Sequence, residues 1–201
     1  MKVVAITQRV VTVPEYGERR DCLDQAWPRF LAECGLTPIV LPNVLAVALQ
    51  LCAAADLGGV VFTGGNDLAQ CGGDAPERDA VEFALLDWAQ KRGLPVLGVC
   101  RGMQVIQRHF GIALHRVDGN VARRQVIRVE GKPREVNSFH HYAALESRPP
   151  LRIWATAEDG AVVKAIRHST EPIMGIMWHP ERCSPFSPAD VALFREVFAV
   201  Q

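Results

Sequence analysis

The sequence has no excess of charge of either sign, because 22 Lys and Arg residues balance 22 Asp and Glu residues. A basic surface that would attract nucleic acid or an anionic membrane is therefore not expected. No apolar run approaches the length of a membrane-spanning helix. The apolar segment Met1 to Thr7 is too short for a signal peptide and has no small-residue cleavage site after it. We therefore expect a cytoplasmic protein that binds neither nucleic acid nor a membrane.

Paired cysteines are also missing. The six cysteines lack the short spacings of a zinc ribbon or a disulfide framework. There is no internal repeat, no low-complexity tract and no convincing linker. At 201 residues the chain is long enough to bury a substantial core, so we expect one domain over residues 1–201. The sequence does not fix the oligomeric state, and a homodimer stays open.

In the first half, apolar runs of strand length alternate with segments of helical period. Continuous apolar runs predict buried strands at 2–6, 39–41, 60–62 and 94–99. Apolar residues at helical spacing predict helices from about 21 to 34 and at 44–55, 78–91 and 103–109. This alternation predicts an α/β fold with an open, mostly parallel sheet flanked by helices, of flavodoxin-like type.

The second half changes character. Short segments separated by turn residues predict antiparallel strands appended to the sheet, at 126–129, 135–137, 153–156, 162–166 and 173–177. A closing helix is expected at 188–200. We expect the polar segment 8–20, with Pro14 and Gly17, to be a loop. Residues 117–132 are also expected to be loop-like and mobile.

The strand predicted at 94–99 breaks abruptly at Gly98-Val99-Cys100-Arg101-Gly102 and is followed by a helix. Glycines two residues before and two after a central residue permit a sharp strand-to-helix turn that projects this side chain at the top of a sheet. Here the side chain is a thiol, and the helix N-terminus beneath it favours a thiolate. A buried core cysteine is the alternative, so the hypothesis of a nucleophile needs a partner.

A partner is available in Trp178-His179-Pro180-Glu181, at the end of the last predicted strand. His179 and Glu181 can project on the same side, so the carboxylate can bond one imidazole nitrogen and leave the other facing a thiol. Gly64 and Gly65 follow the third strand, where a bare backbone can present an N–H to an oxyanion beside the N–H of Arg101. A surface His–Glu pair and a plain glycine turn are the alternatives.

These motifs, together with Val136-Asn137-Ser138-Phe139-His140-His141, resemble a class I glutamine amidotransferase domain. More narrowly, they resemble its free-standing γ-glutamyl hydrolase branch, peptidase C26, over nearly the whole chain. The resemblance implies Cys100 as nucleophile, His179 as base and acid, and Glu181 as the orienting carboxylate. It implies that the N–H groups of Gly65 and Arg101 form the oxyanion hole. No metal or organic cofactor is required.

The same resemblance implies a set of residues that hold the glutamyl group of a small-molecule substrate. They are Gln104, one helical turn after the nucleophile, and Asn137, Ser138, Phe139 and His140. His140 and His141 are neighbours in an extended segment and point opposite ways, so at most one is expected to face the pocket.

The N-terminal segments Ile6-Thr7-Gln8-Arg9, 18–21, 23–27 and Leu41-Pro42-Asn43 are similar to a smaller subgroup. Its members are hydrolases of capsular phosphoramidate pathways, and they act on γ-glutamyl-CDP-amidate. Arg9 lies just past the carboxyl end of the first strand and could meet a phosphate together with Arg19 or Arg20. Solvated loop arginines are the alternative.

The leading hypothesis is hydrolysis of a γ-glutamyl amide or phosphoramidate bond through a cysteine thioester, with γ-glutamyl-CDP-amidate as the preferred substrate. A γ-glutamyl-γ-aminobutyrate-type hydrolase is one alternative. A glutaminase that needs a separate synthetase as its partner is another. A non-enzymatic DJ-1-like redox protein is the third, although such a protein needs no base at His179. The leaving group is expected to contact three loops: the loop after the first strand, residues 68–77 and residues 117–132.

Overall fold

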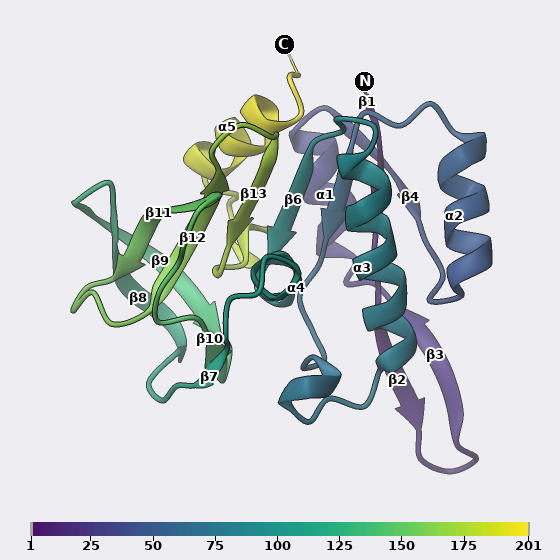
Figure 1. Cartoon of the computed structure of the whole chain (residues 1–201), viewed down its shortest axis with the longest axis horizontal. Helices are drawn as coiled ribbons and strands as arrows, with labels where there is room; N and C mark the ends of the chain where they lie inside the picture. Colours follow the sequence, from purple (N-terminus) through teal and green to yellow (C-terminus); the bar gives the residue numbers. More distant parts are fainter. Residues whose placement is uncertain (1, 201) are drawn as a thin grey trace.

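The computed structural model describes residues 2–200 and is organised around a nine-stranded mixed sheet (Figure 1). Its parallel strands run in the order β4 (Leu36–Val40), β1 (Lys2–Ile6), β5 (Val60–Phe62), β6 (Val96–Val99) and β13 (Ile173–Ile176). The sheet continues antiparallel through β12 (Val163–His168), β11 (Leu151–Ala157), β8 (Val121–Val129) and β9 (Lys132–Phe139). The predicted fold class, a mostly parallel α/β sheet with appended antiparallel strands, is confirmed.

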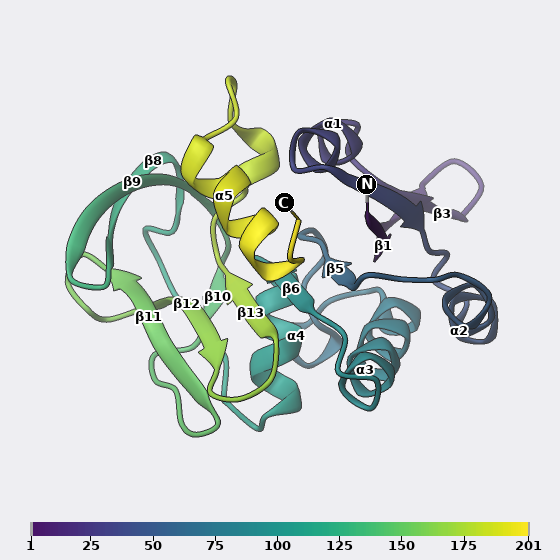
Figure 2. The same cartoon turned by 90° about the horizontal axis from the view of Figure 1, so that it is seen from above.

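Helices cover both faces of the parallel half (Figure 2). On one face lie α1 (Ala26–Glu33) and α5 (Pro188–Val197), whose Phe30 and Phe194 rings meet at 4.7 Å in an apolar cluster. On the other lie α2 (Leu45–Ala54), α3 (Pro76–Gln90) and α4 (Arg101–His109), which belong to a second cluster. Because both faces are covered, β5 and β6 are buried throughout, which explains their unbroken apolar sequences.

The carboxyl ends of four parallel strands meet at the lower edge of the sheet in Figure 1. Register pairs Ile6 with Val61, Phe62 with Gly98, and Val99 with Ile176. The segments that follow β1, β5, β6 and β13 therefore emerge side by side. In open α/β sheets this edge is where ligands bind.

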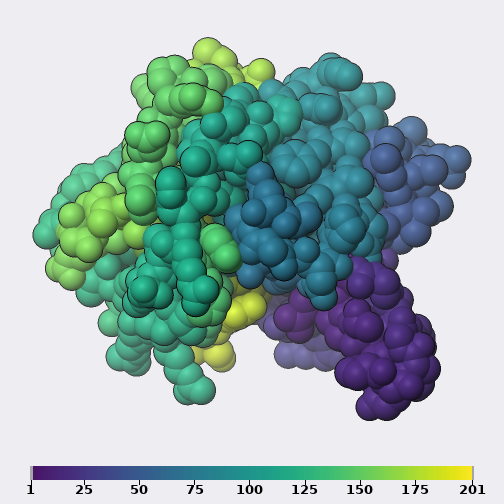
Figure 3. All heavy atoms as spheres, turned by 60° about the horizontal axis from the view of Figure 1, so that its bottom comes forward, coloured from purple at the N-terminus to yellow at the C-terminus, as the bar shows by residue number. Residues whose placement is uncertain are grey.

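Segment 8–20 is not the loop that was expected. Most of it belongs to a β-hairpin of β2 (Arg9–Val13) and β3 (Glu18–Cys22), paired from Arg9 with Cys22 to Val13 with Glu18. Val10, Val11 and Val13 favour a strand, and Gly17, at φ +67°, closes the turn. The prediction failed because β3 is charged and almost fully exposed, so it has no apolar pattern. Figure 3 shows the hairpin, in purple, as a lobe on the carboxyl-end side of the molecule.

The expectation that residues 117–132 are loop-like is also wrong. Most of this segment is β8, a nine-residue strand between β9 and β11. Its last part, 126–129, was predicted as a strand, but Arg123 and Arg124 hid the first part, and only Ile127 is fully buried. A short pair, β7 (His115–Arg116) with β10 (Tyr142–Ala143), and the 3-10 turns η1 (Ala69–Cys71) and η2 (Pro180–Arg182) complete the described elements. Within residues 2–200 no helix has the length and apolar content needed to span a membrane.

Candidate active site

Cys100 occupies the sharp turn between β6 and α4, as the sequence predicts. Its backbone has φ 53° and ψ −107°, a conformation that is strained for a residue with a side chain. A methyl group on Gly98 would lie 2.4 Å from the carbonyl carbon of Gly102, and one on Gly102 would lie 2.4 Å from Phe62 O. Only glycine fits at both positions, so the two glycines allow the helix to start directly against the sheet.

His179 follows β13 and lies beside this turn. Its Nδ1 is 2.8 Å from Oε1 of Glu181, and both side chains are almost fully buried. The Asn137 side chain accepts from the backbone N–H of His179 at 2.7 Å and donates to its carbonyl at 2.8 Å. The ring of Phe139 contacts the imidazole edge-on at 5.8 Å. The position of the imidazole is thus fixed by Asn137 at its backbone, by Glu181 at Nδ1 and by the ring of Phe139.

The surroundings favour a charged imidazole. Burial alone would lower the pKa of His179, but the Cys100 sulfur and the Glu181 carboxylate outweigh it and raise the pKa to about 9. Nδ1 is engaged with Glu181, while Nε2 is buried and has no geometric hydrogen-bond partner among the described residues. Nε2 is therefore the atom available to the thiol or to a group that the thiol attacks.

A cavity of about 230 Å³ opens above Cys100. Its lining is Gly65, Asn66, Asp67, Cys100, Arg101, Gln104, Phe139, His140 and His141. The structure therefore brings together Cys100, both residues expected to form an oxyanion hole, and three of the five residues expected to hold a glutamyl group. The amide of Gln104 donates to Tyr142 O at 2.7 Å, which fixes this side chain at the cavity wall.

The side chains of Asn137 and Ser138 do not line the cavity, contrary to the expectation that they hold substrate. Asn137 binds the His179 backbone, as described above. Ser138 Oγ donates a hydrogen bond to Asn120 O at 2.8 Å and accepts one from Lys164 Nζ at 3.2 Å. Phe139 of the same motif does border the cavity, and its carbonyl accepts from Cys100 Sγ at 3.8 Å.

The expectation that at most one of His140 and His141 faces the pocket is wrong, because both border the cavity. Their rings are nevertheless held differently. Both nitrogens of the buried His140 ring are engaged, Nδ1 with Tyr142 O at 3.1 Å and Nε2 with Lys164 Nζ at 2.9 Å. Burial and the nearby Lys164 lower the pKa of His140 to about 3, so this ring is neutral. His141 is exposed.

Comparison with known proteins agrees with this geometry. The chain matches the peptidase C26 family model over residues 2–124 and 115–181. The chain belongs to the peptidase C26 family. It is similar to the γ-glutamyl-CDP-amidate hydrolase of Campylobacter jejuni, with 29% identity over 186 residues that cover 89% of this chain and 90% of the relative.

Two further similarities extend to the class I glutamine amidotransferases. A glutamine-hydrolysing GMP synthase subunit of Thermococcus kodakarensis is 28% identical over 174 residues, which cover 81% of this chain and 86% of that protein. A solved Thermoplasma acidophilum protein, described as a GMP synthase subunit, has the same fold with a TM-score of 0.73 at 17% identity. That match covers 99% of this chain and 94% of the other. Membership in family C26 identifies the chain as an amide-bond hydrolase.

This C26 protein has a second, smaller cavity of about 90 Å³, which Gly64 and Gly65 also line. Two arginines, Arg9 and Arg182, contribute to its wall. Within residues 2–200 the Arg9 guanidinium forms no hydrogen bond or ion pair, whereas Arg182 lies 3.5 Å from Glu181 and stacks over Phe139 at 4.9 Å. A cation is therefore available beside the loop that borders the main cavity.

The expected partners of Arg9 point elsewhere. Arg19 is engaged with Glu77 and with the carbonyl of Asp74, at the start of α3. Arg20 pairs with Glu18 inside the hairpin. The prediction that either joins Arg9 at a phosphate is not supported by their positions.

A group of buried charges in this C26 protein escaped the sequence analysis. Arg78, Asp79 and Glu82 begin the helix predicted at 78–91 and form ion pairs with each other or with Arg101. Charges in a first helical turn are ordinarily solvent-facing, so nothing local marked them. Their i, i+1, i+4 spacing places them on one face of α3, and this spacing is the sequence feature that could have indicated a cluster of charges.

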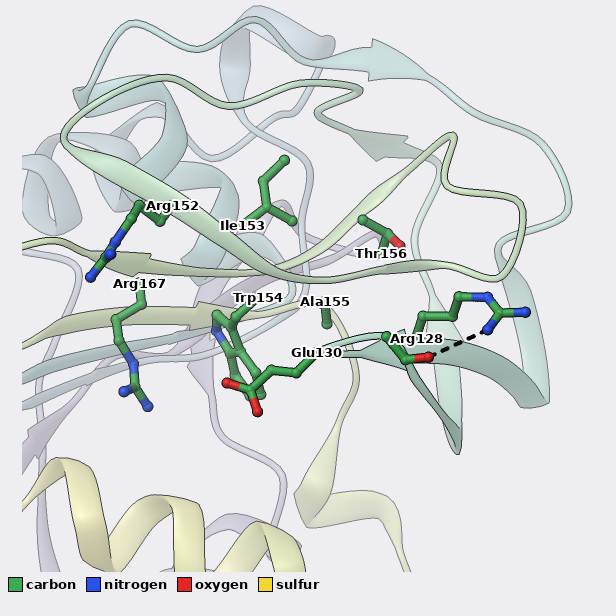
Figure 4. Close-up of a pocket in the computed structure, with 9 residues that line it drawn as sticks. Arg128, Glu130, Arg152, Ile153, Trp154, Ala155, Thr156 and Arg167 are labelled. Carbon is green, nitrogen blue, oxygen red and sulfur yellow. Dashed lines mark hydrogen bonds between the residues drawn. The ribbon is translucent and has the colours of Figure 1, made fainter.

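A further hollow, on β11 and its neighbours, is unrelated to these residues. Figure 4 shows Arg128, Arg152 and Arg167 around Trp154, and no predicted site residue lines this hollow. Within the described residues, no group of three or more His, Cys, Asp or Glu side chains could hold a metal ion. The reactive groups that the structure brings together at the carboxyl-end edge are the thiol of Cys100, the imidazole of His179 and the carboxylate of Glu181.

Proposed function

We propose that this C26 protein hydrolyses a γ-glutamyl amide or phosphoramidate bond through a thioester on Cys100. The observation that carries the proposal is the buried His179–Glu181 pair beside Cys100, under a cavity that also contains Gly65, Arg101 and Gln104. A thiol activated by an oriented imidazole is the arrangement that acyl transfer requires.

In the first step the Cys100 thiolate attacks the γ-carbonyl carbon, and the carbonyl oxygen becomes an oxyanion. The N–H groups of Gly65 and Arg101 stabilise this charge. The tetrahedral intermediate collapses, the C–N bond breaks, and Nε2 of His179 gives its proton to the departing nitrogen. The product amine leaves, and the glutamyl group stays on sulfur as a thioester.

In the second step His179 takes a proton from water as the water oxygen attacks the thioester. The C–S bond then breaks, glutamate leaves, and the proton remaining on His179 restores the starting pair. Glu181 keeps Nδ1 protonated and thereby leaves Nε2 free for both proton transfers. Gln104 contacts the glutamyl group, with Phe139 and His140 forming the wall around it.

γ-Glutamyl-CDP-amidate is the preferred substrate in this proposal. The similarity to the C. jejuni hydrolase over nearly the full length of both chains supports it. The Arg9 guanidinium, which is unpaired within residues 2–200, supports it as well, because its cavity shares Gly65 with the cavity above Cys100. A leaving group that passes over the Gly64–Gly65 loop would meet Arg9 and Arg182, and guanidinium groups suit phosphate oxygens.

Glutamate release decides between substrates. We would assay glutamine, γ-glutamyl-γ-aminobutyrate, a γ-glutamyl peptide and γ-glutamyl-CDP-amidate, each against Cys100→Ala as the blank. Selective turnover of the nucleotide compound supports the proposal. Turnover of the simple amides alone would overturn the phosphoramidate assignment while leaving the γ-glutamyl chemistry intact.

A glutaminase that supplies ammonia to a separate synthetase is the second candidate. The similarity to the glutamine-hydrolysing GMP synthase subunit of T. kodakarensis favours it. It predicts weak turnover of glutamine by the isolated chain and a sharp rise when a synthetase is added. Robust turnover of larger γ-glutamyl compounds by the chain alone would count against it.

A further inference from the structure

Behind the cavity above Cys100, buried charges link the glycine loop after β5 to the turn after β6. Arg78 and Glu82 are fully buried, and Arg101 is almost so. One carboxylate lies at the centre: Glu82 Oε1 accepts from Arg78 Nε at 3.0 Å, and Glu82 Oε2 accepts from Arg101 Nη1. Asp79 Oδ1 accepts a hydrogen bond from the other terminal nitrogen of Arg101, Nη2.

The Arg78 guanidinium holds the glycine loop at two points. Its Nη2 donates to Thr63 O at 2.8 Å and to Thr63 Oγ1 at 3.1 Å, and its Nη1 donates to Gly65 O. These two carbonyls belong to the peptide groups on either side of the Gly64–Gly65 peptide. The N–H of Gly65 belongs to the peptide between them, so fixing both neighbours limits the rotation of this N–H.

The loop needs such restraint, because glycine adds none. Gly65 has φ +85°, and two adjacent glycines can adopt many conformations at little cost. Thr7 adds a further contact, since its Oγ1 donates to Glu82 Oε1 at 2.7 Å and accepts from the N–H of Thr63 at 3.2 Å. The buried carboxylate is thus connected to the loop through Thr7 as well as through Arg78.

The charges are stabilised only as a set. Burial alone would raise the pKa of Glu82, but the guanidinium groups of Arg101 and Arg78 lower it. A buried ion network is a poor source of net stability, because desolvation offsets much of the attraction. A network of this kind is therefore better explained by the geometry that it fixes.

We propose that Arg78 and Glu82 are positioning residues that hold the Gly65 and Arg101 N–H groups in a fixed relation to Cys100. Neither side chain touches the substrate. Arg78 orients the loop, Arg101 anchors the residue after the nucleophile, and Glu82 joins the two. This inference rests on the proposed acyl transfer at Cys100 but not on the identity of the γ-glutamyl substrate.

The test compares two reactions of the same thiol. Iodoacetamide alkylates Cys100 by displacement at a saturated carbon, so no oxyanion forms. p-Nitrophenyl acetate acylates Cys100 through an oxyanion, and it contains no γ-glutamyl group. Mass spectrometry of the Cys100 peptide gives both rates without interference from the other cysteines, and Cys100→Ala provides the blank.

In Glu82→Gln and in the charge-conserving Arg78→Lys we expect acylation to slow by about tenfold to a hundredfold, since loss of one oxyanion-hole donor costs about 10²- to 10³-fold. Alkylation should stay within about twofold. Asp190→Asn is the matched control: this buried carboxylate accepts from Arg134 at 2.7 Å and Trp178 at 2.9 Å, and neither partner belongs to the network of Arg78 and Glu82. It should leave the ratio of the two rates unchanged.

Two results would overturn the inference. In one, a folded variant acylates at the wild-type rate. In the other, acylation and alkylation fall together, which would mean that the variant disturbs the thiol itself. Thermal melts establish folding, and Arg78→Lys serves if Glu82→Gln does not fold. If the wild-type chain is acylated but hydrolyses no γ-glutamyl compound, the substrate assignment is refuted. The ratio of acylation to alkylation in the variants would still test the positioning role of Arg78 and Glu82.

Discussion

Arginine–carboxylate pairs occur both behind Cys100 and in the β2–β3 hairpin, but their surroundings differ. Behind Cys100, the side chains of Arg78 and Glu82 are fully buried. In the hairpin, Arg20 and Glu18 each keep 49% of their side-chain surface exposed. Exposed pairs contribute about 0–1 kcal/mol and exchange partners readily, whereas removing one member of a buried pair costs several kcal/mol.

This difference separates two tasks. The chemistry at Cys100 needs donors and a base that do not move, because misplacement of about 1 Å can cost about a hundredfold in rate. Recognition of a leaving group needs a surface that adapts to its ligand. In our proposal the hairpin, which contains Arg9, serves this second need. At its base Asn66 exchanges hydrogen bonds of 2.9 Å with the N–H and carbonyl of Val10.

The largest effect should come from the buried region, with Cys100→Ala. We expect hydrolysis of every γ-glutamyl substrate to fall by about 10⁴-fold or more, because loss of a nucleophile removes the covalent route. Cys34→Ala is the control: this thiol is buried in the core, and burial raises its pKa to about 12. Glutamate release measures both. Substantial activity in Cys100→Ala would show that another group is the nucleophile.

Glu181→Gln should have the next largest effect, about a hundredfold or more in kcat/KM, because it removes the group that orients the imidazole. In the wild type we expect kcat/KM to fall as pH rises through about 9, where His179 loses its proton. The variant should lose this proton at lower pH, since the hydrogen bond and charge of Glu181 contribute to the raised pKa. Rate profiles between about pH 6 and about pH 10, on either side of the raised pKa, show the shift.

The same raised pKa affects stability. The contribution of protonated His179 to folding is complete below its ordinary value of 6.5 and disappears as pH rises through about 9. Glu18→Gln is the matched control, because Glu18 pairs with the exposed Arg20 inside the hairpin. If kcat/KM of Glu181→Gln fell at the same alkaline pH as kcat/KM of the wild type, this fall could not be assigned to the loss of the His179 proton.

Sequence reasoning succeeded where the determinants are local. A strand buried on both faces has a continuous apolar sequence, so β1, β5 and β6 were predicted close to their observed bounds. The turn at Cys100 is recognisable because its glycines lie at fixed spacing on either side. Strands β2, β3 and β8 are different: most of their residues are not buried, and β3 and β8 contain several charged side chains, so no continuous apolar run marks them.

The site was predictable only in part, for a similar reason. Whether Asn137 faces a substrate or the His179 backbone depends on the path of β9, which no local pattern reveals. The role of Glu82 depends on three segments meeting behind the cavity, since its partners lie at positions 7, 78 and 101. Long-range burial of charge leaves no periodic signal in a single sequence.

At the hairpin, Arg9→Ala should discriminate between leaving groups. We expect kcat/KM for γ-glutamyl-CDP-amidate to fall by about tenfold to a hundredfold, because hydrogen bonds to charged groups contribute about 1.5–3 kcal/mol. Glutamine turnover should change by less than about threefold. Arg20→Ala is the control, since Arg20 pairs with Glu18 and does not line either cavity of the site. Equal losses with both substrates would contradict a role for Arg9 at the leaving group.

The smallest effect on catalysis should come from Arg19→Ala. Arg19 donates to Glu77 at 2.8 Å and to Asp74 O at 2.9 Å, and these contacts attach β3 to the start of α3. Because the pair is exposed, its loss should lower global stability by less than about 1 kcal/mol. Hydrogen exchange should nevertheless become faster in residues 9–22, while exchange in β6 stays unchanged.

Arg20→Ala again provides the comparison, because its partners Glu18 and Tyr16 lie within the hairpin. If Arg19→Ala accelerates exchange in the hairpin and Arg20→Ala does not, the contact with α3 is what restrains the lobe. KM for γ-glutamyl-CDP-amidate should then rise in Arg19→Ala while kcat stays near wild type, since the buried groups around Cys100 are untouched. A fall in kcat without a change in KM would mean that the hairpin and the buried region are coupled, and the two tasks would not be separate.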